Sequence, residues 1–154
     1  MYEPSPAYSG ILKEKTDNMY GEIEKITYFL LLGPSCAGKD HILKKVTRMN
    51  SRLKKLCSVT SRRIRKGEVH GTDYYFLDDE HTLLLDKKYS LRTAEKKGAA
   101  ARFEALFQEG SVIEKSEFTG NLYGLIRQDV VEKAGSSAVL INDSGKDGFA
   151  QINS

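Results

Sequence analysis

The sequence has no tryptophan, and only two cysteines and three prolines occur among its 154 residues. The two cysteines, Cys36 and Cys57, indicate thiols in a reducing cytoplasm rather than a disulfide framework. No apolar run approaches the roughly 20 residues of a membrane span, and the first residues lack the basic and apolar parts of a signal peptide. We therefore expect a cytoplasmic protein with a single buried core and no membrane partner.

Acidic residues are missing from one long stretch of the chain. Residues 41–66 contain ten Lys or Arg and no Asp or Glu. A nucleic-acid surface is one interpretation, but the stretch also lacks aromatic residues on which bases could stack. The favoured interpretation is a solvated helix face followed by an anion-binding loop, so no nucleic-acid partner is expected.

A glycine-rich loop follows the apolar segment 26–32. It consists of Gly33, Pro34, Ser35, Cys36, Ala37, Gly38, Lys39 and Asp40. An apolar strand entering Gly-x-x-x-x-Gly-Lys is the signature of a phosphate-binding loop, whose backbone N–H groups surround phosphate oxygens. Lys39 would reach the β- and γ-phosphates of ATP and neutralise charge as the phosphoryl group moves. The loop therefore predicts ATP phosphate binding by all eight residues, with Lys39 as a catalytic group.

One position departs from that motif. The residue after the lysine is normally Ser or Thr, whose hydroxyl holds Mg²⁺, and here it is Asp40. A carboxylate is also a hard oxygen ligand, so Asp40 is a candidate magnesium ligand. Without the metal, its negative charge beside the phosphates would weaken nucleotide binding.

The periodicity of the chain predicts alternating strands and helices. Strands are expected at 26–32, 56–60, 112–118 and 138–141, helices at 39–51, 79–86, 93–108 and 126–134, and a turn at 120–124. Such alternation is typical of an α/β fold with a parallel core. Residues 1–25 have mixed charge and no periodicity, and we expect them to form an irregular arm.

Three further segments follow the phosphate loop in order. They are Ser58-Val59-Thr60-Ser61-Arg62-Arg63-Ile64-Arg65 continuing to Phe76, then 112–124, and then Val139-Leu140-Ile141-Asn142-Asp143. Together with the loop they closely resemble the guanylate kinase family over about residues 26–152. The resemblance implies a P-loop NTPase-type three-layer sandwich with a parallel core sheet, and a small mixed-β subdomain that binds the nucleoside monophosphate. In these terms 26–154 is one domain, with a P-loop core at 26–60 and 136–154 and a GMP-binding subdomain at 61–125.

The resemblance also assigns residues to GMP. Arg62 and Arg65 would clamp its phosphate and serve catalysis, since guanidinium groups match phosphate oxygens bidentately. The hydroxyls of Tyr74 and Tyr123 would assist them. The carboxylate of Glu114 would accept hydrogen bonds from the guanine N1–H and 2-amino group, a donor pair that adenine lacks.

Two further positions complete the implied site. Ser58 matches a serine that donates to the guanine oxygen, and Asp143 matches the strand end that carries the metal-side aspartate. Spacing to Gly145 leaves the alignment of Asp143 and Asn142 open. Mg²⁺ with ATP is the implied cofactor, held by Asp40 and Asp143.

The implied reaction is phosphoryl transfer from ATP to GMP, which yields ADP and GDP. The attacking group is already an anionic phosphate oxygen, so no general base is needed. The alternative function is a non-catalytic guanylate-kinase-like module that binds a phosphopeptide or another anionic partner. Nucleic-acid binding through 41–66 is a third hypothesis.

Several departures from the family carry expectations of their own. Leu125 stands where the family usually has Ser or Thr near the base, and a helical insertion lies at about 79–109. The sequence ends at Ser154, before the family's lid arginines and last core strands. We therefore expect a core truncated at the C-terminus, weak or absent activity, and self-association through an uncovered apolar edge strand, 26–32.

Overall fold

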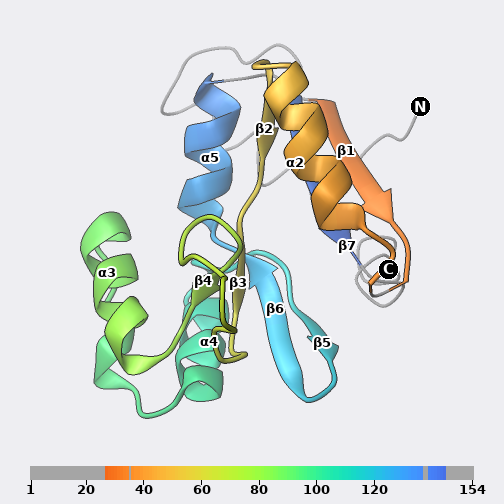
Figure 1. Ribbon diagram of the computed structural model, residues 1–154. Helices are drawn as coiled ribbons and strands as arrows, with labels where there is room; N and C mark the ends of the chain where they lie inside the picture. The colour runs from red at the N-terminus through yellow and green to blue at the C-terminus, as the bar shows by residue number, and fades with distance from the viewer. Residues whose placement is uncertain (1–26, 35, 137–138, 145–154) are drawn as a thin grey trace. The chain divides into compact units, whose positions relative to one another are not determined.

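The computed structural model describes residues 27–34, 36–136 and 139–144. The described chain separates into two compact units, one made of 27–56 with 130–144 and the other of Cys57–Asp129 (Figure 1). The expected arm at 1–25, the loop residue Ser35 and the segment 145–154 lie outside the described residues.

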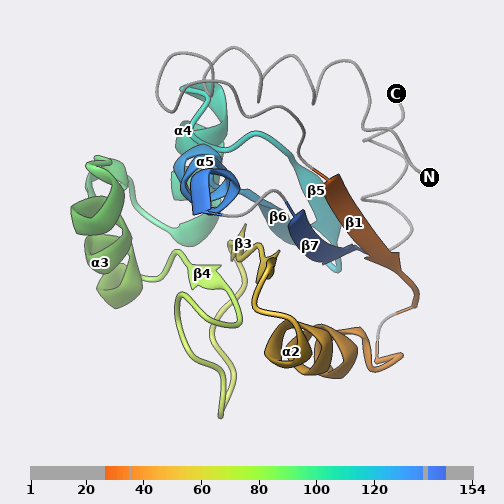
Figure 2. The ribbon, with the colours of Figure 1, turned by 90° about the horizontal axis from the view of Figure 1, so that it is seen from above.

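The first unit is built on a parallel sheet with strand order β1-β7-β2. These strands are Thr27–Leu32, Val139–Ser144 and Leu53–Lys55, and β7 lies between the other two. Parallel strands of one sheet need a crossover connection. Helix α2, Lys39–Met49, supplies it between β1 and β2, and it packs against β2 and β7 on one face of the sheet (Figures 1 and 2).

The buried apolar residues of this unit come from the helices, the central strand and the residue that follows β2. They are Leu43, Leu56, Val130, Val131, Ala134 and Leu140. Strand β1 is more open, since the Phe29 side chain is 51% exposed. Among the described residues β1 pairs only with β7, so it is the edge strand that the sequence predicted. Self-association through this edge remains a prediction.

The second unit contains a mixed sheet with strand order β4-β3-β6-β5. Strands β3 and β4, Ser58–Thr60 and Tyr75–Phe76, are parallel, whereas β6, Asn121–Leu125, is antiparallel to β3 and to β5, Ser116–Phe118. The two turn residues between β5 and β6 are Thr119 and Gly120, with φ of 50° and 73°. Two successive positive φ values are typical of a type I′ hairpin turn.

The helical part of the second unit is fastened by a buried arginine. It comprises α3 (Asp79–Tyr89), the 3₁₀ turn η1 (Thr93–Glu95) and α4 (Ala99–Gln108). Arg102 on α4 is only 6% exposed, and its guanidinium donates to the carbonyl oxygens of Leu77 and Lys96 at 2.9 and 2.8 Å and to Asp79 at 2.7 Å. These bonds tie α4 to the start of α3, so the segment that the sequence identified as an insertion has a fixed place in the unit.

The predicted α/β class, with a parallel core sheet and a separate mixed sheet, is confirmed. Four local predictions were wrong. The single helix expected at 93–108 is divided into η1 and α4. The strand expected at 56–60 is replaced by β2 and β3, which lie in different sheets, because the chain passes from one unit to the other at Leu56 and Cys57. The strand at 112–118 is limited to β5, and the turn at 120–124 is strand β6. None of the described helices is long and apolar enough to cross a membrane.

Helix α5, Arg127–Ser136, follows β6 and leads to β7. It begins and ends close to the predicted bounds of 126–134. Its first turn contributes Asp129 to the second unit, and its later residues belong to the first. The buried cluster of the second unit is Cys57, Val59, Tyr75, Leu77, Leu85, Tyr89, Phe103, Leu106, Val112 and Ile126.

Candidate functional site

The phosphate loop joins β1 to α2 in the first unit. Cys36 and Gly38 have φ of 63° and 81°, and these left-handed conformations turn the backbone tightly ahead of the helix. The Lys39 Nζ donates to the carbonyl oxygens of Gly33 at 2.8 Å and Pro34 at 2.7 Å. The ammonium therefore lies against its own loop, close to the N-terminus of α2, where a phosphate would be favoured.

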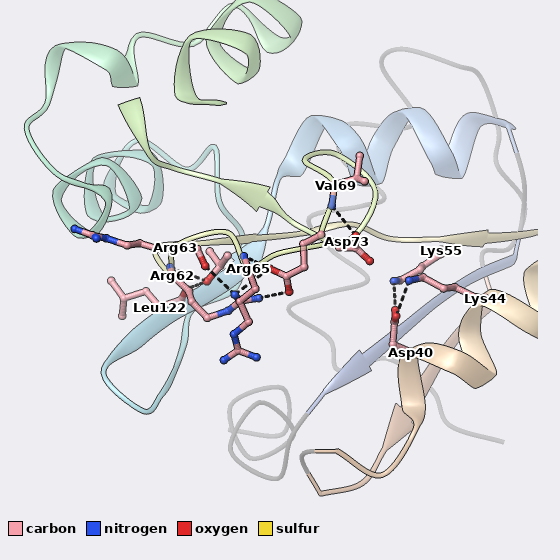
Figure 3. A network of polar contacts seen from close by, with 11 residues as sticks. Asp40, Lys44, Lys55, Arg62, Arg63, Arg65, Val69, Asp73 and Leu122 are labelled. Atoms are coloured by element: carbon pink, nitrogen blue, oxygen red, sulfur yellow. Dashed lines mark hydrogen bonds and ion pairs between the residues drawn. The ribbon is translucent and has the colours of Figure 1, made fainter. Parts of the chain in front are cut away.

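Asp40, in the first turn of α2, is paired with two lysines. Its Oδ1 is 2.7 Å from Lys55 Nζ and its Oδ2 is 2.9 Å from Lys44 Nζ (Figure 3). Burial alone would raise the pKa of Asp40, but the hydrogen bonds from Lys55 and Lys44 hold it below its usual value. Asp40 is thus an ionised carboxylate whose two oxygens are both engaged.

This pairing bears on the expected magnesium ligands. Asp143 lies on β7 opposite Leu31, and its side chain is outside the described residues. Within the described part of the chain, no three His, Cys, Asp or Glu side chains gather into a metal-binding cluster. A carboxylate already bound by two ammonium groups does not fit Mg²⁺, which needs free oxygen ligands. We therefore derive no chemical step through a metal at Asp40.

In the second unit, three of the residues expected to bind GMP come together. The Arg62 guanidinium lies 5.2 Å from the centroid of the Tyr74 ring, and the Tyr74 and Tyr123 rings are 6.0 Å apart, edge to face. The Tyr123 hydroxyl is also close enough to Arg62 to contribute to the raised pKa of the guanidinium, after the larger effect of Glu68. A cation over an aromatic ring is stabilised by the ring quadrupole. We call Arg62, Tyr74 and Tyr123 the arginine–tyrosine cluster.

A buried threonine explains why the cluster forms. Thr60, at the end of β3, is fully buried; its hydroxyl donates to the Leu122 carbonyl at 2.9 Å and accepts the Arg62 N–H at 3.1 Å. Thr60 is also the sheet partner of Tyr123. The start of the basic loop is therefore fixed beside β6, a role of Thr60 that the sequence analysis did not identify.

Glu68 is a second residue that the sequence did not single out. Its Oε1 accepts a hydrogen bond from Arg62 Nη2 at 2.7 Å, and its Oε2 accepts from Arg62 Nη1 at 3.1 Å and from the Arg65 backbone N–H at 2.7 Å. Burial alone would raise the pKa of Glu68, but these hydrogen bonds lower it. The only signal in the sequence is one acid within a basic loop, which does not reveal a pairing across six residues.

The other residues predicted to bind GMP are Ser58, Arg65 and Glu114. Ser58 is half-buried on β3 opposite Leu125, and Glu114 is half-buried just before β5. Arg65 is exposed, and its guanidinium forms no hydrogen bond with any residue that the structure describes. The structure thus brings Arg62, Tyr74 and Tyr123 together and leaves the roles of Ser58, Arg65 and Glu114 as predictions.

Comparisons with known proteins agree with the motifs. The family model described as guanylate kinase matches residues 25–98. The guanylate kinase of Thermobifida fusca (strain YX) is 29% identical over 123 residues, which cover 80% of this chain and 52% of that protein. The guanylate kinase of Anaplasma phagocytophilum (strain HZ) is 32% identical over 127 residues, 80% of this chain and 50% of that protein.

A solved structure supports the same relationship. The crystal structure of guanylate kinase from Anaplasma phagocytophilum has a TM-score of 0.53 and 26% identity, and the match covers 83% of this chain and 52% of that one. The chain spans about half the length of the curated relatives that it matches. The predicted resemblance to the guanylate kinase family is confirmed.

Proposed function

We propose, from the relationship of this chain to the guanylate kinase family, that it binds ATP and GMP and transfers a phosphoryl group between them. The observation that carries the proposal is the meeting of Arg62, Tyr74 and Tyr123 in one unit of a chain that also has a phosphate-binding loop. Each feature suits a different nucleotide, and a kinase for nucleoside monophosphates needs both.

The loop in the first unit would bind the phosphates of ATP. Its tight turn at Cys36 and Gly38 presents backbone N–H groups, and Lys39 lies close enough to exchange its two carbonyl partners for phosphate oxygens. The Lys39 ammonium suits the β- and γ-phosphates because it acts as a point charge with three N–H donors.

The arginine–tyrosine cluster in the second unit would bind the GMP phosphate. Arg62 supplies a planar, always charged group, and the two phenolic hydroxyls can donate to the same anion. Arg65, whose guanidinium forms no hydrogen bond with the described residues, would complete the clamp. Glu114 would select guanine over adenine through the N1–H and 2-amino donors, with Ser58 donating to the guanine oxygen.

The proposed reaction follows from these assignments. An anionic oxygen of the GMP phosphate attacks the γ-phosphorus of ATP, a new O–P bond forms, and the bond from that phosphorus to the bridging oxygen breaks. GDP and ADP are the products. No proton needs to be removed from the nucleophile, so the side chains act by positioning and by neutralising charge. Mg²⁺ would enter with ATP.

A coupled assay of ADP release with ATP, GMP and Mg²⁺ tests this function. We expect weak turnover with GMP and less with AMP, loss of turnover in Lys39→Ala, and reduced guanine preference in Glu114→Gln. Calorimetric titration with GMP and AMP completes the test. Equal binding of the two nucleotides would refute guanine specificity, whereas GMP binding without turnover would favour a non-catalytic module.

A further inference from the structure

The Glu68 carboxylate is bound to both arginines that are expected to clamp the acceptor phosphate. One of its oxygens accepts from the Arg62 side chain, and the other accepts from the Arg62 side chain and the Arg65 backbone. We infer that Glu68 is a positioning residue, which orients Arg62 for the phosphate of the acceptor nucleotide. This inference rests on the proposed function and adds a residue to that same site.

The donor inventory of Arg62 supports this role. A guanidinium has five N–H donors. Three of them are used: Nη1 donates to Glu68 and to the Arg63 carbonyl at 2.8 Å, and Nη2 donates once to Glu68. Glu68 therefore occupies the end of the fork, between Nη1 and Nη2. The Nε–H and the second Nη2–H lie side by side on the edge of the group that can bind a phosphate bidentately, and among the described residues the further hydrogen-bonding neighbour of the guanidinium is the Tyr123 hydroxyl of the same cluster.

The plane of the guanidinium is also restricted by packing. Its central carbon lies 5.2 Å from the Tyr74 ring centroid and 5.6 Å from that of Phe76. The Arg62 and Glu68 side chains are only 11% and 20% exposed. A long side chain would otherwise lose considerable rotamer entropy when it binds a ligand. Three hydrogen bonds and two rings hold the Arg62 guanidinium in one orientation before the ligand binds, which reduces that cost.

The charge balance favours positioning over inhibition. Glu68 neutralises one arginine, but the same loop contains Arg63, Arg65 and Lys66, so it remains cationic. Glu68 also accepts the Arg65 N–H and donates its own N–H to the Arg65 carbonyl at 3.1 Å. Glu68 thus also shapes the turn that carries Arg65. A carboxylate that only competed with phosphate for Arg62 would need no such bonds to Arg65.

The test compares Glu68→Gln with Glu117→Gln, a matched loss of one negative charge on the exposed strand β5 of the same unit. Calorimetry with GMP and with guanosine separates the contribution of the phosphate from that of the base. We expect Glu68→Gln to weaken GMP binding by roughly tenfold, as for other residues that orient a ligand-binding group, and to leave guanosine binding unchanged. Glu68→Asp, which retains the charge, should recover part of the loss, and Glu117→Gln should match the wild type.

The outcomes separate this inference from the proposed function. If wild-type protein binds GMP and Glu68→Gln binds it equally well, Glu68 does not position Arg62. If Glu68→Gln binds GMP more tightly, Glu68 competes with the phosphate and the inference is also overturned. Loss of GMP and guanosine binding together would identify Glu68 as only structural. Failure of the wild type to bind GMP would refute the proposed function, and the inference with it.

Discussion

The α-carbon of Gly124 packs directly against the backbone carbonyl of Glu114. A β-carbon at Gly124 would overlap that carbonyl oxygen and would lie 2.6 Å from Val112 Cγ1 and 3.0 Å from Phe103 Cζ. Two of these neighbours are buried core residues, so they cannot move away at low cost. We expect Gly124→Ala to lower the free energy of unfolding by about 2–3 kcal/mol and to weaken guanine recognition by displacing Glu114.

Urea unfolding followed by circular dichroism measures the first effect, and GMP titration measures the second. Gly120→Ala is the control, because Gly120 has a positive φ but no atom within 4 Å of the added carbon. It should cost only the strain of the left-handed conformation, about 1 kcal/mol. If both variants lose the same stability and bind GMP equally, close packing at Gly124 is not important.

Asp129 holds two tyrosine hydroxyls in the interior of the second unit. It is 2% exposed, and its Oδ1 accepts hydrogen bonds from Tyr75 at 3.0 Å and Tyr89 at 2.9 Å. Burial is the main cause that raises the pKa of both phenols, and the negative charge of Asp129 adds to it. We expect Tyr89→Phe to cost about 1 kcal/mol of unfolding free energy, and Asp129→Ala about 3 kcal/mol because it leaves both hydroxyls without their acceptor.

Thermal and urea unfolding of the two variants check these values. Tyr123→Phe serves as the control, since its hydroxyl lies outside this buried group, and its stability should stay within about 0.5 kcal/mol of wild type. Equal losses in Tyr89→Phe and Asp129→Ala would show that Asp129 does not hold the two hydroxyls together.

The local elements of the core were predictable because their signals are short-range. The apolar run at 27–32, the loop glycines and the amphipathic segment after Lys39 specify a strand, a turn and a helix within a few residues. The division at Leu56 and Cys57 was not predictable, because both residues are apolar and continue the pattern of a single strand. Which sheet each side joins depends on partners far along the chain, β7 for β2 and β6 for β3.

The candidate site shows the same limit. The resemblance to the guanylate kinase family implied phosphate-binding roles for Arg62, Tyr74 and Tyr123, and the structure places these three residues together. Thr60 and Glu68 were missed because they act by holding other residues, the start of the basic loop and Arg62, rather than by contacting a ligand. Neither a buried threonine nor a single acid in a basic loop has a distinctive spacing in the sequence. The hairpin at Thr119 and Gly120 was misplaced by a few residues since the glycine at 124 also resembled a turn signal.

His70 should make stability depend on pH. Its Nδ1 accepts the Phe76 N–H at 3.0 Å, and its ring stacks on His81 at 4.7 Å. Burial is the largest cause that lowers the pKa of His70. The positive charges of His81 and Lys88 also lower it, the negative charge of Asp78 opposes the shift, and the resulting pKa is about 4. The unfolded chain, with a His pKa near 6.5, binds more protons between these values. Stability from this group is therefore full above about pH 6.5 and is lost as the pH falls toward 4.

The slope contributed by His70 should be at most about 1.4 kcal/mol per pH unit. His70→Gln retains an acceptor for the Phe76 N–H but does not titrate, so its unfolding free energy should change less between pH 7 and 4.5. Nuclear magnetic resonance of the His70 ring protons gives a direct measurement. A titration midpoint near 6.5 in the folded protein would contradict the prediction, as would identical pH profiles for variant and wild type.

If Asp40 pairs with Lys44 and Lys55, its removal should strengthen ATP binding. If Asp40 were a metal ligand, its removal should weaken the binding of the magnesium complex. Asp40→Asn removes the negative charge with which both ammonium groups pair, so their positive charge acts more strongly on phosphate. Because these side chains are partly exposed, the attraction gained is modest, and we expect ATP binding in EDTA to tighten by roughly three- to tenfold. Stability should change by less than about 0.5 kcal/mol, since surface ion pairs contribute little.

Calorimetric titration with ATP, first in EDTA and then with Mg²⁺, distinguishes the two roles of Asp40. If Asp40 only pairs with the lysines, Asp40→Asn binds the magnesium complex at least as well as the wild type does. If Asp40 coordinates the metal, the variant loses affinity only when Mg²⁺ is present, and the assignment of Asp40 to the lysines is wrong. Asp40→Ser sharpens the comparison because it restores the hydroxyl typical of the motif: a lower magnesium requirement than in wild type would mean that the native carboxylate was not serving as the ligand.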